Sequence, residues 1–255
     1  MIPKVIPPLT GCTILVTRPE QQAASLCAEI ERLGGRAVRF PTIAIEPVVA
    51  MAAEECDLAV FTSISAVAHG RLLIPLDNNV RVAAIGRATA QALTAAKVKV
   101  DYVPEAGFTS EALLAHPQLQ LTPGMRALIV KGQGGRELLQ QSFESSGLSV
   151  QIREVYRRVR PALDPSLRDA YETEWAANGI DVVALTSVAT LENLLEMLTE
   201  RGQQLVRSMD AIVASSRIAE AAVSAGIQGE IIIAPGADDA SLIGALARTR
   251  TRARP

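Results

Sequence analysis

The sequence predicts an α/β protein with two similar domains, each built around a parallel sheet. Short apolar runs rich in β-branched residues alternate with segments of helical periodicity along the chain, which is typical of βαβ units. The order of these segments returns in the second half, which indicates a duplicated domain. A chain of 255 residues, of which 49% are hydrophobic, can bury the cores of two such domains.

The expected elements form six strand and helix pairs and one additional helix. In the first half the strands are 13–17, 58–62 and 82–85, followed by helices 20–33, 65–73 and 88–96. In the second half the strands are 127–131, 181–186 and 211–214, followed by helices 137–146, 189–198 and 218–225. A further helix is expected after Asp164-Pro165, because Asp is a favoured N-cap and Pro fits the first helical position.

Three pairs of segments make the repeat concrete. ILVT at 14 resembles LIVK at 128, and DLAVFTS at 57 resembles DVVALTS at 181. VAAIGRATA ending at Ala90 resembles DAIVASSRIA ending at Ala219. The offset between partners grows slowly along the chain, as expected for two related domains with loops of different length.

Two extended stretches interrupt the alternation, at residues 36–47 and 150–161. Both are β-prone, carry arginines and contain a proline, Pro41 or Pro161, that lacks a backbone donor. We interpret them as connections between domains, and ordinary edge strands stay open as the alternative.

Composition narrows the function classes. Lys and Arg number 25 against 27 Asp and Glu, so the net charge of −2 argues against a broad surface for nucleic acid. Aromatic residues make up only 3% of the chain, which leaves little for stacking on bases or a flavin. No apolar run has the length of a membrane helix, and residues 1–11 lack the regions of a signal peptide, so we expect a cytoplasmic protein without a membrane partner.

Cysteine and histidine usage predicts that the protein holds no metal. The three cysteines, Cys12, Cys27 and Cys56, lack CxxC spacing and lie in or beside apolar segments, so we expect reduced, buried thiols. The two histidines, His69 and His116, show no spacing typical of metal ligands.

Polar turns follow the predicted strands, where parallel sheets bind ligands and helices expose unpaired N–H groups. They are Thr17-Arg18, Thr62-Ser63, Gly86 to Thr89, Lys131 to Arg136, Thr186-Ser187 and Ser215 to Arg217. Each turn alone is weak evidence, because Ser and Thr cap helices generally. Six of them in matching repeats indicate a ligand with several negative charges.

The segment KGQGGRE at 131–137 places a glycine loop after a strand. A dinucleotide site would need GxGxxG, but Glu137 occupies the position of the third glycine, so we reject that site. An anion-binding turn with Lys131 and Arg136 and a purely structural turn both stay open.

Few residues are suited to acid–base chemistry. His69 falls on a predicted helix and fits packing or the surface better than catalysis. Tyr156 stands among arginines in the second extended stretch. A free phenol has a pKa of about 10, so at neutral pH it can donate a hydrogen bond or a proton. An aromatic residue that merely packs against the domains is the alternative.

Six segments together resemble the uroporphyrinogen-III synthases along nearly the whole chain. They are TILVTRPEQQ at 13–22, LGGRAVRFPTIAIEP at 33–47, FTSISAV at 61–67, IGRATA at 85–90, GGRELLQ to EVYRRV between 134 and 159, and LTSVATLENLL at 185–195. No single segment is very specific, but their order and spacing are.

This resemblance implies two flavodoxin-like parallel-sheet domains joined by a two-stranded β linker, with the active site in a cleft between them. One domain is then expected to comprise residues 1–38 plus 159–255, and the other residues 42–154. The linker strands are expected near 39–41 and 155–158. The family expectation is a monomer that needs no cofactor, and transient contact with neighbouring pathway enzymes stays open.

The reaction of this family is the closure of hydroxymethylbilane, a linear tetrapyrrole with eight carboxylates, a hydro-lyase reaction on the way to haem, sirohaem and cobalamin. The electron-rich pyrrole helps to expel the terminal hydroxyl, and ring D is inverted through a spiro intermediate. Without the enzyme, the bilane closes to the type I isomer. Selectivity therefore depends on held geometry.

The resemblance also implies roles for individual residues. Tyr156 matches the tyrosine of the family's linker and is expected to assist departure of the hydroxyl, and Thr89 is expected to hydrogen-bond the reacting end. The residues expected to bind carboxylates are Thr62, Ser63, Gly86, Thr186 and Ser187, with Arg18, Lys131 and Arg136 as weaker candidates. Where many members have a Gly-Pro-Thr-Thr-like turn, this chain has Ser215-Ser216-Arg217-Ile218, so only Ser215 or Ser216 offers a hydroxyl there.

Two other classes of protein fit parts of the pattern. A non-enzymatic binding protein with two hinged domains explains the repeat and the polar turns, but it gives Tyr156 no role. A transferase of phosphorylated metabolites needs an acidic cluster for a metal. Asp238-Asp239 is the only acidic pair so placed, and it more simply begins the last helix.

Overall fold

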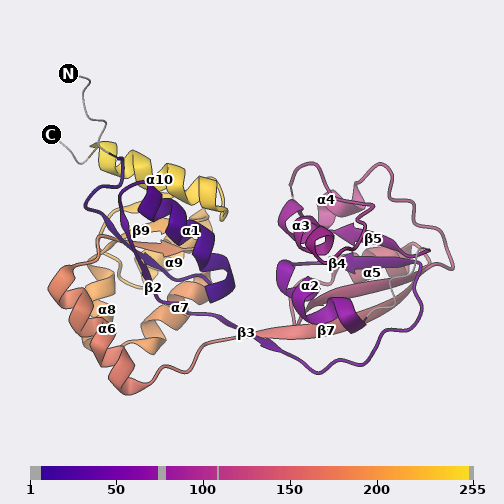
Figure 1. Cartoon of the computed structure of the whole chain (residues 1–255), viewed down its shortest axis with the longest axis horizontal. Helices are drawn as coiled ribbons and strands as arrows, with labels where there is room; N and C mark the ends of the chain where they lie inside the picture. The colour runs from indigo at the N-terminus through magenta and orange to yellow at the C-terminus, as the bar shows by residue number, and fades with distance from the viewer. Residues whose placement is uncertain (1–6, 74–78, 108, 253–255) are drawn as a thin grey trace. The chain divides into compact units, whose positions relative to one another are not determined.

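The computed structural model describes residues 7–73, 79–107 and 109–252, with side chains up to residue 248. The chain divides into two compact units (Figure 1). The first unit combines Met1–Ala44 with Val159–Pro255, and the second unit is Ile45–Arg158.

The first unit is a five-stranded parallel sheet covered by helices on both faces (Figure 1). The strand order is β10-β9-β8-β1-β2. Its strands are β1 (Thr13–Val16), β2 (Arg36–Arg39), β8 (Val182–Leu185), β9 (Asp210–Val213) and β10 (Ile231–Ile233). Its helices are α1 (Glu20–Arg32), α6 (Pro165–Asn178), α7 (Val188–Met197), α8 (Glu200–Arg207), α9 (Ser216–Ser224) and α10 (Asp239–Arg252).

Alternate residues along the strands of the first sheet belong to two separate cores, because successive side chains of a strand point to opposite faces. Ile14 packs with α1 and α10, whereas its neighbour Leu15 packs with α6 to α9. Asp164 caps α6 as expected, with its carboxylate accepting from the backbone N–H groups of Ser166 and Leu167. The central strand β8 is buried at every position, which explains its unbroken apolar character.

The second unit has the same layered design around a sheet of order β3-β7-β6-β4-β5. Its strands are β3 (Ala44–Pro47), β4 (Leu58–Phe61), β5 (Arg81–Ala84), β6 (Arg126–Gly132) and β7 (Ser149–Val159). Its helices are α2 (Ile64–Gly70), η1 (Arg71–Leu73), α3 (Arg87–Ala95), α4 (Ser110–Leu114) and α5 (Leu138–Ser145). One core contains residues of α2 and α3, and the other contains residues of α4 and α5.

The strand order confirms the predicted repeat in three dimensions. In the first sheet β9, β8, β1 and β2 are successive neighbours, and in the second β5, β4, β6 and β7 occupy the same places. The sequence pairs of β1 with β6, β4 with β8 and β5 with β9 are therefore pairs of equivalent strands, one from each unit. In the first unit β1 and β2 come before β8 and β9 along the chain, whereas in the second unit their equivalents β6 and β7 come after β4 and β5. These four strands are therefore circularly permuted between the two units.

The second extended stretch is for the most part a strand inside the second sheet. β7 lies between β6 and β3, which excludes the edge-strand alternative for this stretch. The first stretch is divided: it supplies β2 to the first sheet and β3 to the second. Pro41 and Pro161 both lie in coil outside the strands, where a missing backbone donor costs little.

Two further expectations concern cysteines and membrane helices. Cys12, Cys27 and Cys56 are buried, as predicted, and each is a thiol outside any disulfide. Burial raises the pKa of the Cys27 thiol despite the nearby Arg39 guanidinium. Over the described residues, no helix combines the length and the apolar character required to cross a bilayer.

Candidate active site

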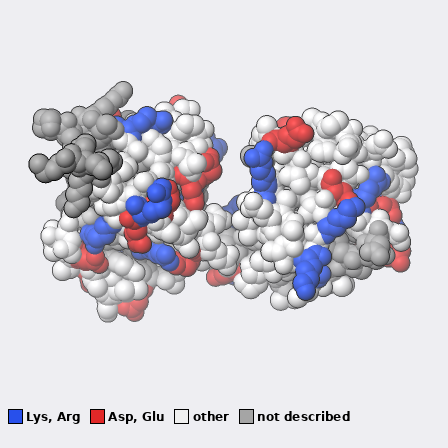
Figure 2. Space-filling view, turned by 45° about the horizontal axis from the view of Figure 1, so that its top comes forward, with Lys and Arg blue, Asp and Glu red and all other residues white. Residues whose placement is uncertain are grey.

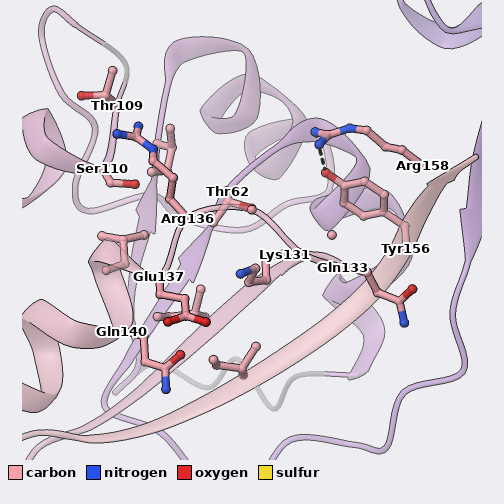
Figure 3. A pocket seen from close by; sticks show the side chains of 17 residues that line it. Thr62, Thr109, Ser110, Lys131, Gln133, Arg136, Glu137, Gln140, Tyr156 and Arg158 are labelled. Atoms are coloured by element: carbon pink, nitrogen blue, oxygen red, sulfur yellow. Dashed lines mark hydrogen bonds between the residues drawn. The ribbon is translucent and has the colours of Figure 1, made fainter. Parts of the chain in front are cut away.

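A cavity of about 350 Å³ opens in the second unit near the carboxyl ends of β4, β5 and β6 (Figure 3). Ligands of doubly wound sheets are bound at such strand ends. The residues that line it are Thr62, Ile85, Thr109, Ser110, Ile129, Lys131, Gly132, Gln133, Gly134, Gly135, Arg136, Glu137, Leu139, Gln140, Ile152, Tyr156 and Arg158. The polar rim and apolar floor suit a ligand that carries both charges and rings.

Tyr156 is the buried phenol of this cavity, with only 2% of its surface exposed. It stands on β7 where the register of β6 and β7 shifts, opposite Gly132. A Cβ atom on Gly132 would lie 2.5 Å from Cζ of Tyr156, so the ring packs directly on the glycine backbone. Gly132, the first glycine of the KGQGG segment, thus leaves the space that the Tyr156 ring occupies.

Two side chains reach the hydroxyl of Tyr156. Ser63 Oγ lies 3.0 Å from it, and either oxygen can be the donor. Arg158 donates from Nη2 over 3.3 Å (Figure 3), and its guanidinium lies 5.7 Å from the ring centroid. The imidazole of His69 is 6.4 Å from the tyrosine ring, centroid to centroid, and its buried Nε2 has no hydrogen-bond partner among the described residues.

Basic and hydroxyl side chains surround the same opening. Arg136 extends toward Thr109 and Ser110, and its guanidinium pairs with Glu111 over 2.5 Å (Figure 3). The pKa of the Glu111 carboxyl is lowered by its own backbone N–H, by the Thr109 hydroxyl and then by Arg136. Lys131, at the end of β6, points its ammonium group to the same cavity. Sequence reasoning missed Thr109 and Ser110, because they follow no predicted strand.

The glycine loop after β6 has a defined conformation. Gly134 and Gly135 both adopt positive φ, at 70° and 83°, which side-chain-bearing residues rarely tolerate. Gln133 donates its backbone N–H to the Tyr156 carbonyl over 2.8 Å, and Gly134 donates to Glu154 over 3.2 Å. The loop is thereby fastened to β7 beside the tyrosine.

The structure brings five predicted site residues together. Thr62, Lys131, Arg136 and Tyr156 line the cavity, and Ser63 contacts it through the Tyr156 hydroxyl. Ser63 also caps α2, since its Oγ accepts from the Ala66 N–H over 3.0 Å.

Gly86 and Thr89 lie outside the lining of this cavity. Gly86 is the N-cap of α3, and Thr89 is 6% exposed on the first turn of that helix. Their predicted contacts with the substrate stay predictions.

The remaining predicted residues belong to the first unit. Ser187 caps α7 by accepting from the Thr190 N–H over 3.1 Å, and Thr186 precedes it after β8. Ser215 is the N-cap of α9 without a side-chain cap bond, and Ser216 begins that helix. That these four residues bind carboxylates of the substrate stays a prediction.

Arg18 is engaged within the first unit. Its guanidinium pairs with Asp239 and donates to the Ala237 carbonyl, and its side chain is 9% exposed. Asp238 accepts from the Ser241 N–H, and Asp239 lies in the first turn of α10. Across the parts of the chain that the structure describes, no cluster of three or more His, Cys, Asp or Glu side chains is suited to hold a metal ion.

A family model for uroporphyrinogen-III synthase HemD matches residues 24–244. The chain belongs to the uroporphyrinogen-III synthase family. Among its curated relatives, the uroporphyrinogen-III synthase of Salmonella typhimurium is 33% identical over 250 residues, which cover 92% of this chain and 99% of the relative. The Escherichia coli synthase is 32% identical over the same shares of the two chains.

Solved structures of this family share the fold. The synthase structure from Helicobacter pylori aligns with a TM-score of 0.58 at 15% identity, over 95% of this chain and 100% of that one. A Thermus thermophilus synthase structure aligns with a TM-score of 0.54 at 20% identity, over 96% of this chain and 100% of that one. As a uroporphyrinogen-III synthase, the chain is a lyase of tetrapyrrole biosynthesis that cyclises and dehydrates hydroxymethylbilane. This favours the enzyme over the binding protein and the transferase.

Proposed function

We propose that the cavity of the second unit holds the reacting end of hydroxymethylbilane, and that Tyr156 donates the proton with which the terminal hydroxyl leaves. The pyrrole supplies the electron pair, the carbon–oxygen bond breaks, and the hydroxyl departs as water. The substituted carbon of ring D, at the other end of the bilane, then attacks the cationic carbon and forms the spiro intermediate, which reopens and closes with ring D inverted. The proton released when the macrocycle forms restores the phenol.

The buried hydroxyl of Tyr156 is the observation that carries this proposal. It lies in a cavity together with the cations of Lys131 and Arg158, and it is held by hydrogen bonds rather than exposed to bulk water. A positive charge beside the phenol oxygen stabilises the negative charge that develops as the proton leaves. Because the substrate needs only this assistance, neither a strong nucleophile nor a cofactor is required.

Carboxylates of the substrate are proposed to bind the cations and turns around the cavity. Lys131 and Arg136 supply positive charge, and Arg136 is already oriented by Glu111. The hydroxyls of Thr62 and Ser110 line the same opening and can donate hydrogen bonds. Gly86 and Thr89 in this unit, and Thr186, Ser187, Ser215 and Ser216 in the other, remain candidates for further contacts.

A cytoplasmic location and the absence of a nucleic-acid partner also belong to the proposal. Three buried thiols outside any disulfide fit a reducing compartment. On the face seen in Figure 2, basic and acidic side chains are interspersed over each unit, which gives little attraction for a polyanionic helix.

The first test is Tyr156→Phe, assayed for the type I and type III isomers formed from fresh hydroxymethylbilane. We expect kcat for the type III isomer to fall about 10- to 100-fold, at or below the lower end of general-acid effects, since the pyrrole itself helps to expel the hydroxyl. KM should stay close to that of the wild type. Tyr102→Phe is the matched control, because Tyr102 is buried in the same unit but belongs to a different core, where its hydroxyl accepts from Arg81.

An unchanged kcat for Tyr156→Phe would remove this residue from the mechanism. If the wild-type protein bound the bilane without raising the yield of type III, the hinged binding protein would become the better interpretation.

A further inference from the structure

We infer that Ser63 and Arg158 are positioning residues that aim the proton of Tyr156 into the cavity. Both donate a hydrogen bond to the phenol oxygen, so that the tyrosine's own O–H remains free for the substrate. This inference rests on the proposed role of Tyr156 and assigns Ser63 a different task from the carboxylate binding expected from sequence.

The donors and acceptors available to Ser63 favour one direction for its hydrogen bond with Tyr156. A hydroxyl has one donor and two acceptor lone pairs. Ser63 Oγ already accepts the N–H of Ala66 over 3.0 Å, while among the described residues its own proton has its partner in Tyr156, 3.0 Å away. The direction that uses this proton is from Ser63 to Tyr156. The opposite direction would turn the phenol proton away from the substrate.

Arg158 fills the second acceptor position of the phenol oxygen. A guanidinium can only donate, and Nη2 of Arg158 lies 3.3 Å from the oxygen. Tyr156 and Arg158 stand two positions apart on β7, and side chains at this spacing share one face of a strand. Arg158 lines the cavity beside the tyrosine, so its charge also faces the oxygen as the proton departs (Figure 3).

The neighbouring Arg157 shows that this placement is specific to one face of β7. Its guanidinium pairs with Glu46 over 2.8 Å, away from Tyr156, and both arginines are exposed. Arg157 and Arg158 therefore have the same chemistry and neighbouring positions, but only Arg158 contacts the phenol. The pair provides a matched comparison within the chain.

Ser63 and Arg158 each have an alternative role that predicts a different effect on kcat, KM or stability. Arg158 could bind a substrate carboxylate directly, and Ser63 could serve only as the cap of α2. In the first case the loss of Arg158 raises KM and acts independently of Tyr156. In the second case the loss of Ser63 lowers stability without a change in kcat.

The test is a double-mutant cycle with Ser63→Ala and Arg158→Gln, each in the wild-type and in the Tyr156→Phe background. In the wild-type background we expect kcat for the type III isomer to fall about 5- to 10-fold for each variant, the loss of one hydrogen bond, with KM unchanged. In the Tyr156→Phe background neither change should lower kcat more than about twofold, because the groups act through the missing hydroxyl.

Three control variants test whether a loss of kcat arises merely from a lost helix cap or a lost arginine charge. Ser63→Thr keeps both the hydroxyl and the cap and should restore at least half of kcat. Arg157→Gln should leave kcat unchanged. Asp164→Ala removes the cap of α6 and should lower thermal stability without affecting kcat.

The outcomes separate the two proposals. Equal losses of kcat with and without Tyr156 would overturn the positioning role, as would a rise in KM without a fall in kcat. If Tyr156→Phe alone were without effect, the proposed function of Tyr156 would fail instead. Should Ser63→Ala not fold, the Arg158 arm and Ser63→Thr still decide the question.

Discussion

At the scale of single residues, the contact between Gly132 and Tyr156 decides the shape of the site. From sequence, Gly132 belonged to a glycine loop whose role was open between anion binding and a structural turn. The structure gives it a third task, because the tyrosine ring occupies the space in which any side chain at this position would stand. The register shift of β6 and β7 occurs at the same point.

We predict that Gly132→Ala displaces the Tyr156 ring and lowers kcat about tenfold or more, since catalytic geometry tolerates little displacement. The added methyl group would meet Cζ at 2.5 Å, and a buried ring cannot move without loss of its contacts. Steady-state kinetics on the type III isomer, together with a melting curve, would measure this.

Gly244→Ala is the control for Gly132→Ala. Gly244 lies in α10, and a Cβ atom there has open space. The substitution should raise stability by up to about 1 kcal/mol through helix propensity and leave kcat unchanged. Full activity of Gly132→Ala would show that the ring has room to adapt.

At the scale of elements, the repeat extends to individual hydrogen bonds. Asp57, before β4, accepts from the backbone N–H of Arg126 at the start of β6 over 2.8 Å. Its repeat partner Asp181, before β8, accepts from the N–H of Thr13 at the start of β1 over 2.7 Å. Because β4 corresponds to β8 and β6 to β1, the two units join equivalent strands by the same contact.

The Asp57 contact predicts an acid-sensitive stability. Hydrogen bonds from the Arg126 guanidinium, and then from its backbone N–H, hold the pKa of Asp57 below its usual value. The folded pKa is thus lower than the unfolded value of about 3.9. The resulting stabilisation is complete above about pH 4 and is lost as the pH falls through the folded pKa.

Asp57→Asn should therefore lower Tm at pH 7, and the difference from wild type should shrink toward pH 3. Melting curves across this range would test the prediction. Asp169→Asn is the control, because the Asp169 side chain is 64% exposed and pairs with its neighbour Arg168, so its loss should change Tm little at any pH. A difference for Asp57→Asn that is independent of pH would exclude an ionic origin.

At the scale of the whole molecule, each unit contains its own two cores. The clusters of the second unit consist only of residues from within 45–150 and the end of β7. The chain of the first unit is interrupted, whereas that of the second is continuous. The cores of the second unit are therefore built from one continuous segment of the chain.

We predict that a fragment of residues 45–158 folds alone and unfolds cooperatively. Urea titration followed by circular dichroism, and the dispersion of amide signals in NMR spectra, would test this. Phe143→Ala in the fragment is the control: Phe143 is fully buried, and its removal should cost about 3 to 5 kcal/mol and abolish the transition. A wild-type fragment without a cooperative transition would show that the unit needs the rest of the chain.

The sequence by itself determined the elements, the duplicated α/β architecture and the family. Alternating apolar runs and helical periodicity are local signals, and the six matching segments are read in order along the chain. These signals also placed Thr62, Lys131 and Arg136 at the ends of strands and Tyr156 in the second extended stretch.

Only the tertiary structure decided which of these groups meet. Strand order placed β4 and β7 on either side of β6 and so joined Ser63 to Tyr156, and the fold of the first unit paired Arg18 with Asp239. The contribution of Thr109 and Ser110 was likewise invisible, because α4 follows no strand in the pattern. The physical reason is that periodicity reports the face on which a side chain lies, whereas a hydrogen bond depends on distances set by residues far away in the sequence.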